Sequence, residues 1–133
     1  MSIVLDTNVL VAGLLSGTGP PAWIVDAVLA GRFDLAIDSS IREEYGNVLR
    51  RPEFGFPQSR VDTLLGAIDR FALWVTAAPP CPVRPPDADD EPFLAVAAAS
   101  ERVLVTGTLR HFPARCRGGV RVQTPRQFYD DQR

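Results

Sequence analysis

The chain opens with an uninterrupted apolar stretch that ends abruptly in polar side chains. Ile3, Val4 and Leu5 lead directly into Asp6. A strand with one solvated face would alternate apolar and polar residues, so this run predicts a strand covered on both faces, as in a parallel sheet. Ligands bind beyond the carboxyl ends of such strands, which places Asp6 where chemistry is expected. Alternatively, Asp6 caps the following helix.

The rest of the chain alternates between helical and extended patterns. Apolar residues at spacings of three and four, with Gly and Pro at the boundaries, predict six helices. These helices span residues 7–15, 20–29, 41–49, 58–72, 87–100 and 124–129, and further strands are expected at 33–38, 73–76, 103–106 and 120–123. The five prolines in the segment 79–86 predict an irregular loop. The pattern as a whole predicts a three-layer α/β/α sandwich around a mostly parallel five-stranded sheet.

Details of three helices are also predicted. Ser39 or Ser40 is expected to cap the third helix. The buried faces of the fourth and fifth helices are expected to comprise Val61, Leu64, Leu65, Ile68 and Phe71, and Phe93, Leu94, Ala97 and Ala98, respectively.

The composition fits a single domain spanning residues 1–133 and narrows its chemistry. With 133 residues, 46% of them hydrophobic, the chain can bury one core. A net charge of −2 argues against coating nucleic acid by bulk charge. All 14 basic residues are Arg, so no mechanism through a Lys nucleophile or Schiff base is available. Phosphotransfer domains of the receiver or haloacid-dehalogenase-like kind rely on a Lys and are therefore disfavoured.

Cysteine usage and hydropathy indicate a soluble, cytoplasmic protein that does not associate with a membrane. Cys81 and Cys116 lie far apart, without a CxxC pair and with only His111 as a further ligand, so free thiols are expected rather than a zinc site. No apolar run reaches about 18 residues, and no basic region precedes an apolar one at the start of the chain.

Three carboxylates occupy positions from which they can meet. Asp6 ends the first strand, and Asp90 begins the fifth helix, where the helix dipole favours an anion. Glu44 lies three residues after Ile41 on the buried face of the third helix, whereas Glu43 is more exposed. Like charges gather only around a counter-charge, and in the absence of Lys a hard cation such as Mg²⁺ or Mn²⁺ can supply it.

Five short motifs follow one another along the chain. They are VLDTNVL at 4–10, EEYGNVL at 43–49 followed by RP at 51–52, DADDEPFL at 87–94, VTG at 105–107 and TPRQF at 124–128. In this order and over essentially the whole length, they resemble the PIN-domain family, and within it the VapC-like toxin components of toxin–antitoxin systems. The resemblance implies a compact α/β/α fold and a metal-dependent nuclease that acts on RNA with Mg²⁺ or Mn²⁺.

The resemblance also implies roles for individual residues. Asp6, Glu44 and Asp90 correspond to the first three acids of the family, which hold the metal. Asn8 corresponds to a residue that orients the site, and the hydroxyl of Thr106 lines it.

The fourth acid of the family pattern falls on Thr108, where this chain departs from it. Three carboxylates suffice for one divalent ion and suit two ions poorly. Thr108 is able to hold a metal-bound water. Asp87 or Asp89 could substitute for the missing acid; alternatively, these two residues are solvated and only place negative charge at the N-terminus of a helix. The alternative function is a weakened or inactive PIN domain that binds RNA or a partner.

Hydrolysis of RNA phosphodiester bonds is the expected reaction. One Mg²⁺ held by Asp6 and Asp90, with Glu44 orienting a ligand water, would activate the attacking water and neutralise charge at the phosphate. We use the term rim for the end of the sheet where Asp6, Glu44 and Asp90 are expected to lie. Candidate RNA contacts near this rim are Arg110, His111, Arg115, Arg117 and Arg121. Alternatively, these side chains are solvated or pack locally.

The resemblance further suggests a cognate antitoxin, whose tail would fill the acidic groove with a basic side chain, and a toxin homodimer. Trp23, Phe54 and Phe56 are candidates for exposed contact residues, although they could equally belong to the core.

Overall fold

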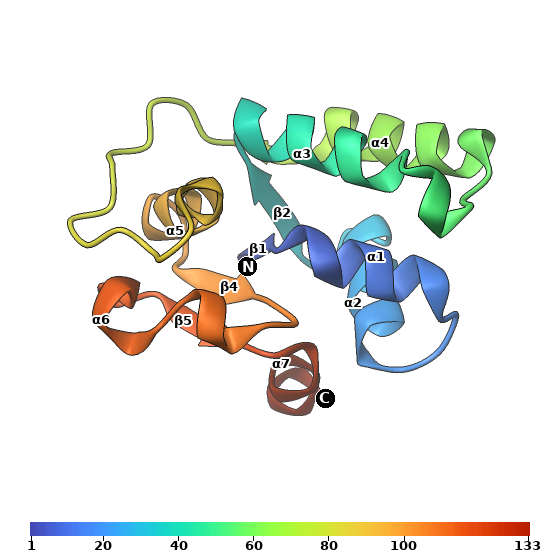
Figure 1. Cartoon of the computed structure of the whole chain (residues 1–133). Coiled ribbons are helices and arrows are strands. Elements are labelled where there is room, and N and C mark those ends of the chain that lie inside the picture. Colours follow the sequence, from blue (N-terminus) through green and yellow to red (C-terminus); the bar gives the residue numbers. More distant parts are fainter.

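A parallel sheet of five strands forms the centre of the molecule, as described by a computed structural model of residues 1–133. The strands are β1 (Ser2–Leu5), β2 (Asp34–Ile37), β3 (Leu73–Trp74), β4 (Val103–Val105) and β5 (Arg121–Gln123). Their order is β3-β2-β1-β4-β5, and all neighbouring pairs are parallel, which makes β1 the central strand (Figure 1).

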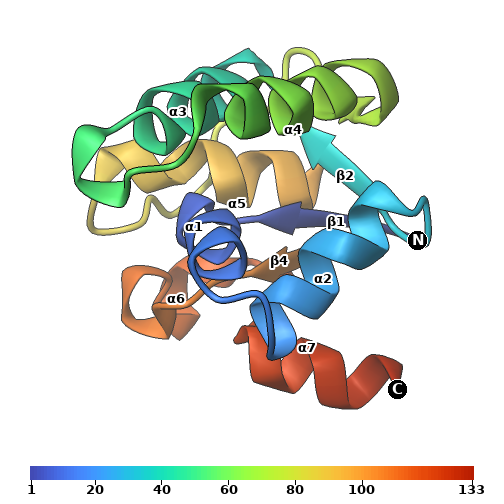
Figure 2. The same ribbon diagram turned by 90° about the vertical axis from the view of Figure 1, so that its right-hand side faces the viewer.

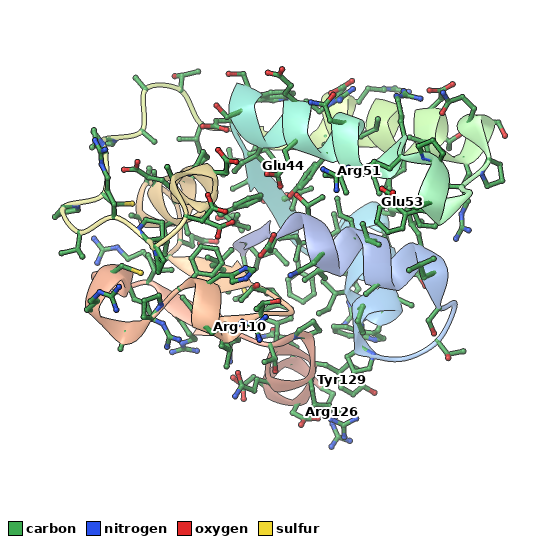
Figure 3. All side chains as sticks on the ribbon, in the orientation of Figure 1. Glu44, Arg51, Glu53, Arg110, Arg126 and Tyr129 are labelled. Atoms are coloured by element: carbon green, nitrogen blue, oxygen red, sulfur yellow. The ribbon has the colours of Figure 1, made fainter.

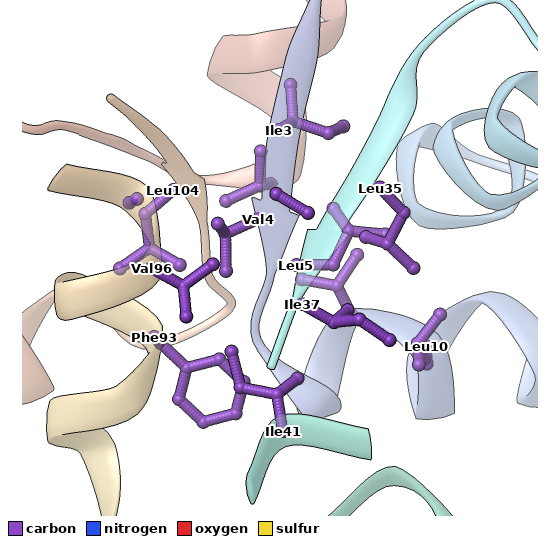
Figure 4. Packing of buried hydrophobic residues seen from close by; sticks show 14 of the residues in the cluster. Ile3, Val4, Leu5, Leu10, Leu35, Ile37, Ile41, Phe93, Val96 and Leu104 are labelled. Atoms are coloured by element: carbon purple, nitrogen blue, oxygen red, sulfur yellow. The ribbon is translucent and has the colours of Figure 1, made fainter. Parts of the chain in front are cut away.

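The strand β1 is buried along its whole length, as its apolar run predicts. Ile3, Val4 and Leu5 are each 0% exposed. Figure 4 shows side chains packed on both sides of β1, with Val96 from one flanking helix and Leu10 from another. Cover on both faces explains why the strand contains no alternating polar residues.

Seven α-helices surround the sheet. They are α1 (Thr7–Leu15), α2 (Pro20–Leu29), α3 (Ser39–Leu49), α4 (Gln58–Phe71), α5 (Glu91–Ala98), α6 (Ala114–Arg117) and α7 (Pro125–Gln132), with 3-10 turns η1 (Pro52–Phe54), η2 (Ala88–Asp90) and η3 (Leu109–His111). Figures 1 and 2 show α5 on one face of the sheet and α1 and α2 on the other, with α7 beside α2. The predicted α/β/α sandwich is confirmed, with a sheet that is entirely parallel.

The structure corrects several predicted details. Asp38 caps α3 by accepting a hydrogen bond from the backbone N–H of Ile41, in place of Ser39 or Ser40. Phe71 is 73% exposed, because it is the last residue of α4 and lies at the margin of the apolar face. Ala98, the last residue of α5, is also exposed, and Ala95 and Val96 are buried instead.

Several elements were missed or are shorter than expected. The four-residue helix α6 was not predicted, because one turn is too short to show helical periodicity. Strand β3 has two residues, fewer than the predicted segment 73–76. The proline-rich segment 79–86 has no regular structure, as predicted.

No single helix is long and apolar enough to cross a membrane. The helices α1 and α2 reach the required length and hydropathy only when taken together, and they are bent by 104° relative to each other.

Candidate active site

Asp6 is held at the carboxyl end of β1 by the sheet and by one hydroxyl. Its backbone N–H donates to the carbonyl of Val105 at 2.9 Å, one residue beyond the end of β1. The residue is 6% exposed, and its Oδ2 accepts a hydrogen bond of 2.8 Å from the hydroxyl of Thr106. No side-chain hydrogen bond caps α1, so the carboxylate is directed to the rim rather than used as a cap.

A second set of hydrogen bonds ties the start of α1 to the loop after β4. The side-chain oxygen of Asn8 accepts from the backbone N–H of Gly107 at 3.0 Å, and its Nδ2 donates to the hydroxyl of Thr108 at 3.4 Å. The backbone N–H of Thr108 donates in turn to Thr106 Oγ1 at 3.1 Å. A Cβ at position 107 would lie 3.3 Å from the Asn8 amide, so glycine permits this close approach.

Glu44 reaches the same rim from α3. Its carboxylate accepts a hydrogen bond from the hydroxyl of Thr7, the residue after Asp6. The next residue, Tyr45, is fully buried, and its hydroxyl donates to the carbonyl of Leu5 at 2.6 Å. These two contacts fix α3 against the end of β1 and explain why Glu44 is half-buried while Glu43 is exposed.

Asp90 enters the rim from η2, immediately before α5. The side chain is 15% exposed, and its Oδ2 lies 3.8 Å from Nδ1 of His111 in η3. His111 is therefore drawn toward the acids rather than packed elsewhere, although 45% of its side chain stays exposed.

The three carboxylates share one electrostatic environment. Burial raises the pKa of Asp6, and the hydrogen bond from Thr106 opposes the rise. Burial and then repulsion from Asp6 also raise the pKa of Glu44. The same two causes raise the pKa of Asp90 to about 6, against the attraction of His111. The rim thus carries negative charge that neighbouring protein groups leave largely uncompensated.

Comparison with known proteins identifies the family. A family model described as the PIN domain matches residues 2–109. The chain belongs to the PIN-domain family. Searches of curated proteins and of solved structures found no match. PIN domains are generally nucleases and typically use divalent metals, and the matched segment of this PIN domain includes every rim residue described above except His111.

The donors at the rim of this PIN domain suit a hard divalent cation. They are carboxylate and hydroxyl oxygens. Burial raises the pKa values of all three acids, and repulsion from Asp6 adds to the rise at Glu44 and Asp90, a condition that a cation would relieve. No set of three or more Asp, Glu, His or Cys side chains is arranged to hold an ion directly. Mg²⁺ is usually bound by one or two carboxylates and keeps several waters, so a water-mediated third contact agrees with this arrangement.

The predicted basic cluster is only partly assembled beside the acids of the PIN domain. Arg110 belongs to η3, between Thr108 and His111, and is exposed. Arg115 is exposed on α6. Arg117 is engaged elsewhere, since its Nε donates to the carbonyl of Phe112 at 2.8 Å. The prediction that Arg121 lies near the acids is wrong, because Arg121 begins β5 and therefore lies at the amino end of the parallel strands, away from the carboxylates.

Three residues of the rim were not predicted as part of the site. The contacts of Thr7 with Glu44 and of Tyr45 with Leu5 depend on how α3 packs against β1, which residue spacing alone does not give. Arg51, which follows α3, attracts Glu44 and lowers its pKa against the effect of burial. The RP pair at 51–52, which follows the second motif, is the feature of the sequence that could have pointed to Arg51.

Proposed function

We propose that this protein is a Mg²⁺- or Mn²⁺-dependent endoribonuclease, and the toxin of a toxin–antitoxin pair. The observation that carries the proposal is that Asp6, Glu44 and Asp90, from three distant segments, share one end of a parallel sheet in a PIN domain, near enough for Asp6 to raise the pKa values of the other two. Such an edge is where open α/β sheets bind ligands, and the uncompensated carboxylates call for a cation there.

In this proposal each residue has a defined task. Asp6 and Asp90 would hold the cation, directly or through water, and Glu44 would orient a water molecule. Thr106 keeps the Asp6 carboxylate in place through its hydrogen bond of 2.8 Å. The cation would supply an activated water and neutralise charge developing on the phosphate.

Cleavage of RNA by matched variants tests the proposal. The purified chain is incubated with tRNA, rRNA and mRNA, with Mn²⁺, with Mg²⁺ or with EDTA. We expect metal-dependent cleavage by the parent, and its loss in Asp6→Asn and Glu44→Gln. The control is Glu43→Gln, which removes the adjacent but exposed carboxylate and should cleave at the parental rate. Equal rates in the parent and in Asp6→Asn would refute the assignment.

The toxin role rests on the resemblance to VapC-like proteins and is tested in cells. Induced expression of the parent should arrest growth, whereas Asp6→Asn at the same expression level should not.

The candidate contact residues for an antitoxin or a second copy, Trp23, Phe54 and Phe56, are all half-buried. Trp23 packs edge-on against Tyr129 with ring centres 5.1 Å apart, and Phe54 stacks on Phe56 at 5.7 Å. An antitoxin and a homodimer remain part of this proposal.

A second candidate function is a PIN domain that binds RNA or a partner without cleaving it. Two observations favour it: Thr108 stands where the family pattern has its fourth acid and already accepts a hydrogen bond from Asn8, and no set of three ligands is arranged to hold an ion. Calorimetric titration with Mn²⁺ separates the two functions. A nuclease that lacks one acid should bind Mn²⁺, and Thr108→Asp should raise both its affinity and its rate. A non-catalytic domain should bind no metal at millimolar concentration.

A further inference from the structure

Most of the arginines in this protein are already engaged. Five pair with carboxylates, two lie over aromatic rings and two donate to backbone carbonyls: Arg42, Arg50, Arg84, Arg126 and Arg133; Arg32 and Arg70; and Arg60 and Arg117, respectively. Arg51, Arg102, Arg110, Arg115 and Arg121 make none of these contacts. Because the chain has no Lys, these five guanidinium groups are the strong side-chain cations without an intramolecular partner of these kinds, and they are the first candidates to bind an external anion.

The available arginines are not spread evenly around the acids. Arg102 and Arg121 lie at the amino ends of β4 and β5, whereas the carboxylates lie at the carboxyl end of the sheet. Arg115 is on α6, beyond η3. Arg51 and Arg110 are left as the exposed arginines next to the rim, since one attracts Glu44 and the other stands between Thr108 and His111 in sequence.

These two arginines lie on opposite sides of Asp6. Arg51 follows α3, which continues from β2, whereas Arg110 follows β4, and β2 and β4 flank β1 from opposite sides. Figure 3 shows the same arrangement, with Glu44 and Arg51 on one side of the molecule and Arg110 on the other. A negatively charged strand that crosses the carboxylates would therefore meet a guanidinium before and after them.

We propose that Arg51 and Arg110 form a phosphate clamp that lays single-stranded RNA across the acid rim, one phosphate on each side of the scissile one. This inference rests on the proposed ribonuclease function. The acids alone would repel RNA, so cations on both flanks are needed to bring the backbone close. The guanidinium group suits this task because its planar donors bind phosphate oxygens in pairs.

The salt dependence of RNA binding distinguishes the clamp from a purely structural role for Arg51. If Arg51 served only to balance Glu44, its removal would change the stability of the protein and the pKa of Glu44, and RNA affinity would not respond to salt any differently. Contacts to phosphate release counterions, so each contact adds to the slope of log affinity against log salt concentration.

The test measures binding without cleavage. A short fluorescein-labelled oligouridine is used in EDTA, so that no metal is present and the proposed metal-dependent hydrolysis does not occur. We expect Arg51→Ala and Arg110→Ala each to weaken binding about tenfold and to reduce the salt slope by about 0.7. Arg51→Lys should recover part of the affinity, because it restores the charge but not the paired donors.

Two arginines serve as matched controls. Arg50 precedes Arg51 but is held by Asp62 and Gln58, each at 2.7 Å, and Arg121 lies at the far edge of the sheet. Arg50→Ala and Arg121→Ala should keep the parental affinity and salt slope. The clamp is refuted if Arg51→Ala and Arg110→Ala bind as tightly as these controls, with circular dichroism confirming that all four variants are folded.

Failure of the clamp and failure of the ribonuclease function give different results. A chain that cleaves RNA while Arg51→Ala and Arg110→Ala retain the parental salt slope is a nuclease without this clamp. A chain that never cleaves RNA, but loses affinity and salt slope in these two variants alone, has the clamp without the proposed catalysis.

Discussion

Thr106 is the residue that connects the sheet to the charge of the rim. It is 0% exposed, its hydroxyl donates to Asp6, and the same oxygen accepts from the backbone N–H of Thr108. One hydroxyl thus stabilises a buried carboxylate and positions the loop that follows β4. A hydroxyl is needed here because valine, which has the same shape, would leave both partners without their hydrogen bonds.

Replacing this hydroxyl should therefore destabilise the protein measurably. We expect Thr106→Val to lower the free energy of unfolding by about 2 kcal/mol at neutral pH, because a buried charged group loses its donor. The loss should be smaller in an Asp6→Asn background, where no charge needs the donor. Urea denaturation of the four proteins in this cycle gives the coupling, and equal losses in both backgrounds would contradict it.

At the scale of elements, close packing between helices depends on glycine at one position and not at another. Gly13 lies in α1 where α2 crosses it, and a Cβ there would come within 2.9 Å of Val25 Cγ2 and 3.1 Å of the Pro21 carbonyl. Gly66 lies in α4, and a Cβ there would meet no atom within 4 Å. The two glycines are both helical, so they isolate the effect of packing from that of helix propensity.

The same substitution should therefore have opposite effects at these two positions. We expect Gly66→Ala to stabilise the protein by about 0.5–1 kcal/mol, because alanine loses less conformational freedom in a helix. Gly13→Ala should destabilise it by about 1–3 kcal/mol, because α1 and α2 must move apart. Thermal unfolding of both variants checks the signs, and stabilisation by Gly13→Ala would show that α1 and α2 are not packed this closely.

These elements also show which parts of the fold could be predicted from the sequence. The bounds of α1 and α2 were predicted because Gly19, Pro20 and Gly31 mark them chemically. Asp6 could be placed at the carboxyl end of a buried strand because the apolar run of that strand ends in it. The approach of Glu44 and Asp90 to Asp6 required β1 to be central, and the alternation of strands and helices does not determine the strand order. The Thr7–Glu44 and Tyr45–Leu5 contacts could not be predicted, because they depend on the rotation of α3 about its axis.

At the scale of the whole molecule, the acid rim opposes the stability of the fold. The buried core favours folding, while three carboxylates held close together are harder to ionise in the folded chain than in the unfolded one. Proteins retain such local destabilisation where a site is arranged for a ligand rather than for stability. The balance between core and rim therefore depends on pH and on bound cations.

The direction of the pH dependence follows from the raised pKa values. An acid whose folded pKa exceeds its unfolded one binds more protons in the folded state, so stability falls as pH rises between the two values. For Asp90 this interval runs from its ordinary value to about 6, and Asp6 and Glu44 act in the same direction. In EDTA, we expect the unfolding free energy to fall by about 1–2 kcal/mol between about pH 4.5 and 7, after allowance for screening by solvent.

Mn²⁺ should reverse this loss, because a cation that binds only the folded, ionised rim stabilises it by mass action. The increase in melting temperature on adding Mn²⁺ should therefore be larger at about pH 7.5 than at about pH 5, where Asp90 is largely protonated. Asp90→Asn removes the carboxyl group whose pKa is raised to about 6, so it should flatten the pH profile in EDTA and reduce the response to Mn²⁺. Asp26→Asn, an exposed carboxylate on α2, is the control and should behave like the parent. A profile in EDTA that rises with pH over this interval would mean that the three carboxylates are already neutralised within the protein, and the argument for a cation at the rim would lose its electrostatic basis.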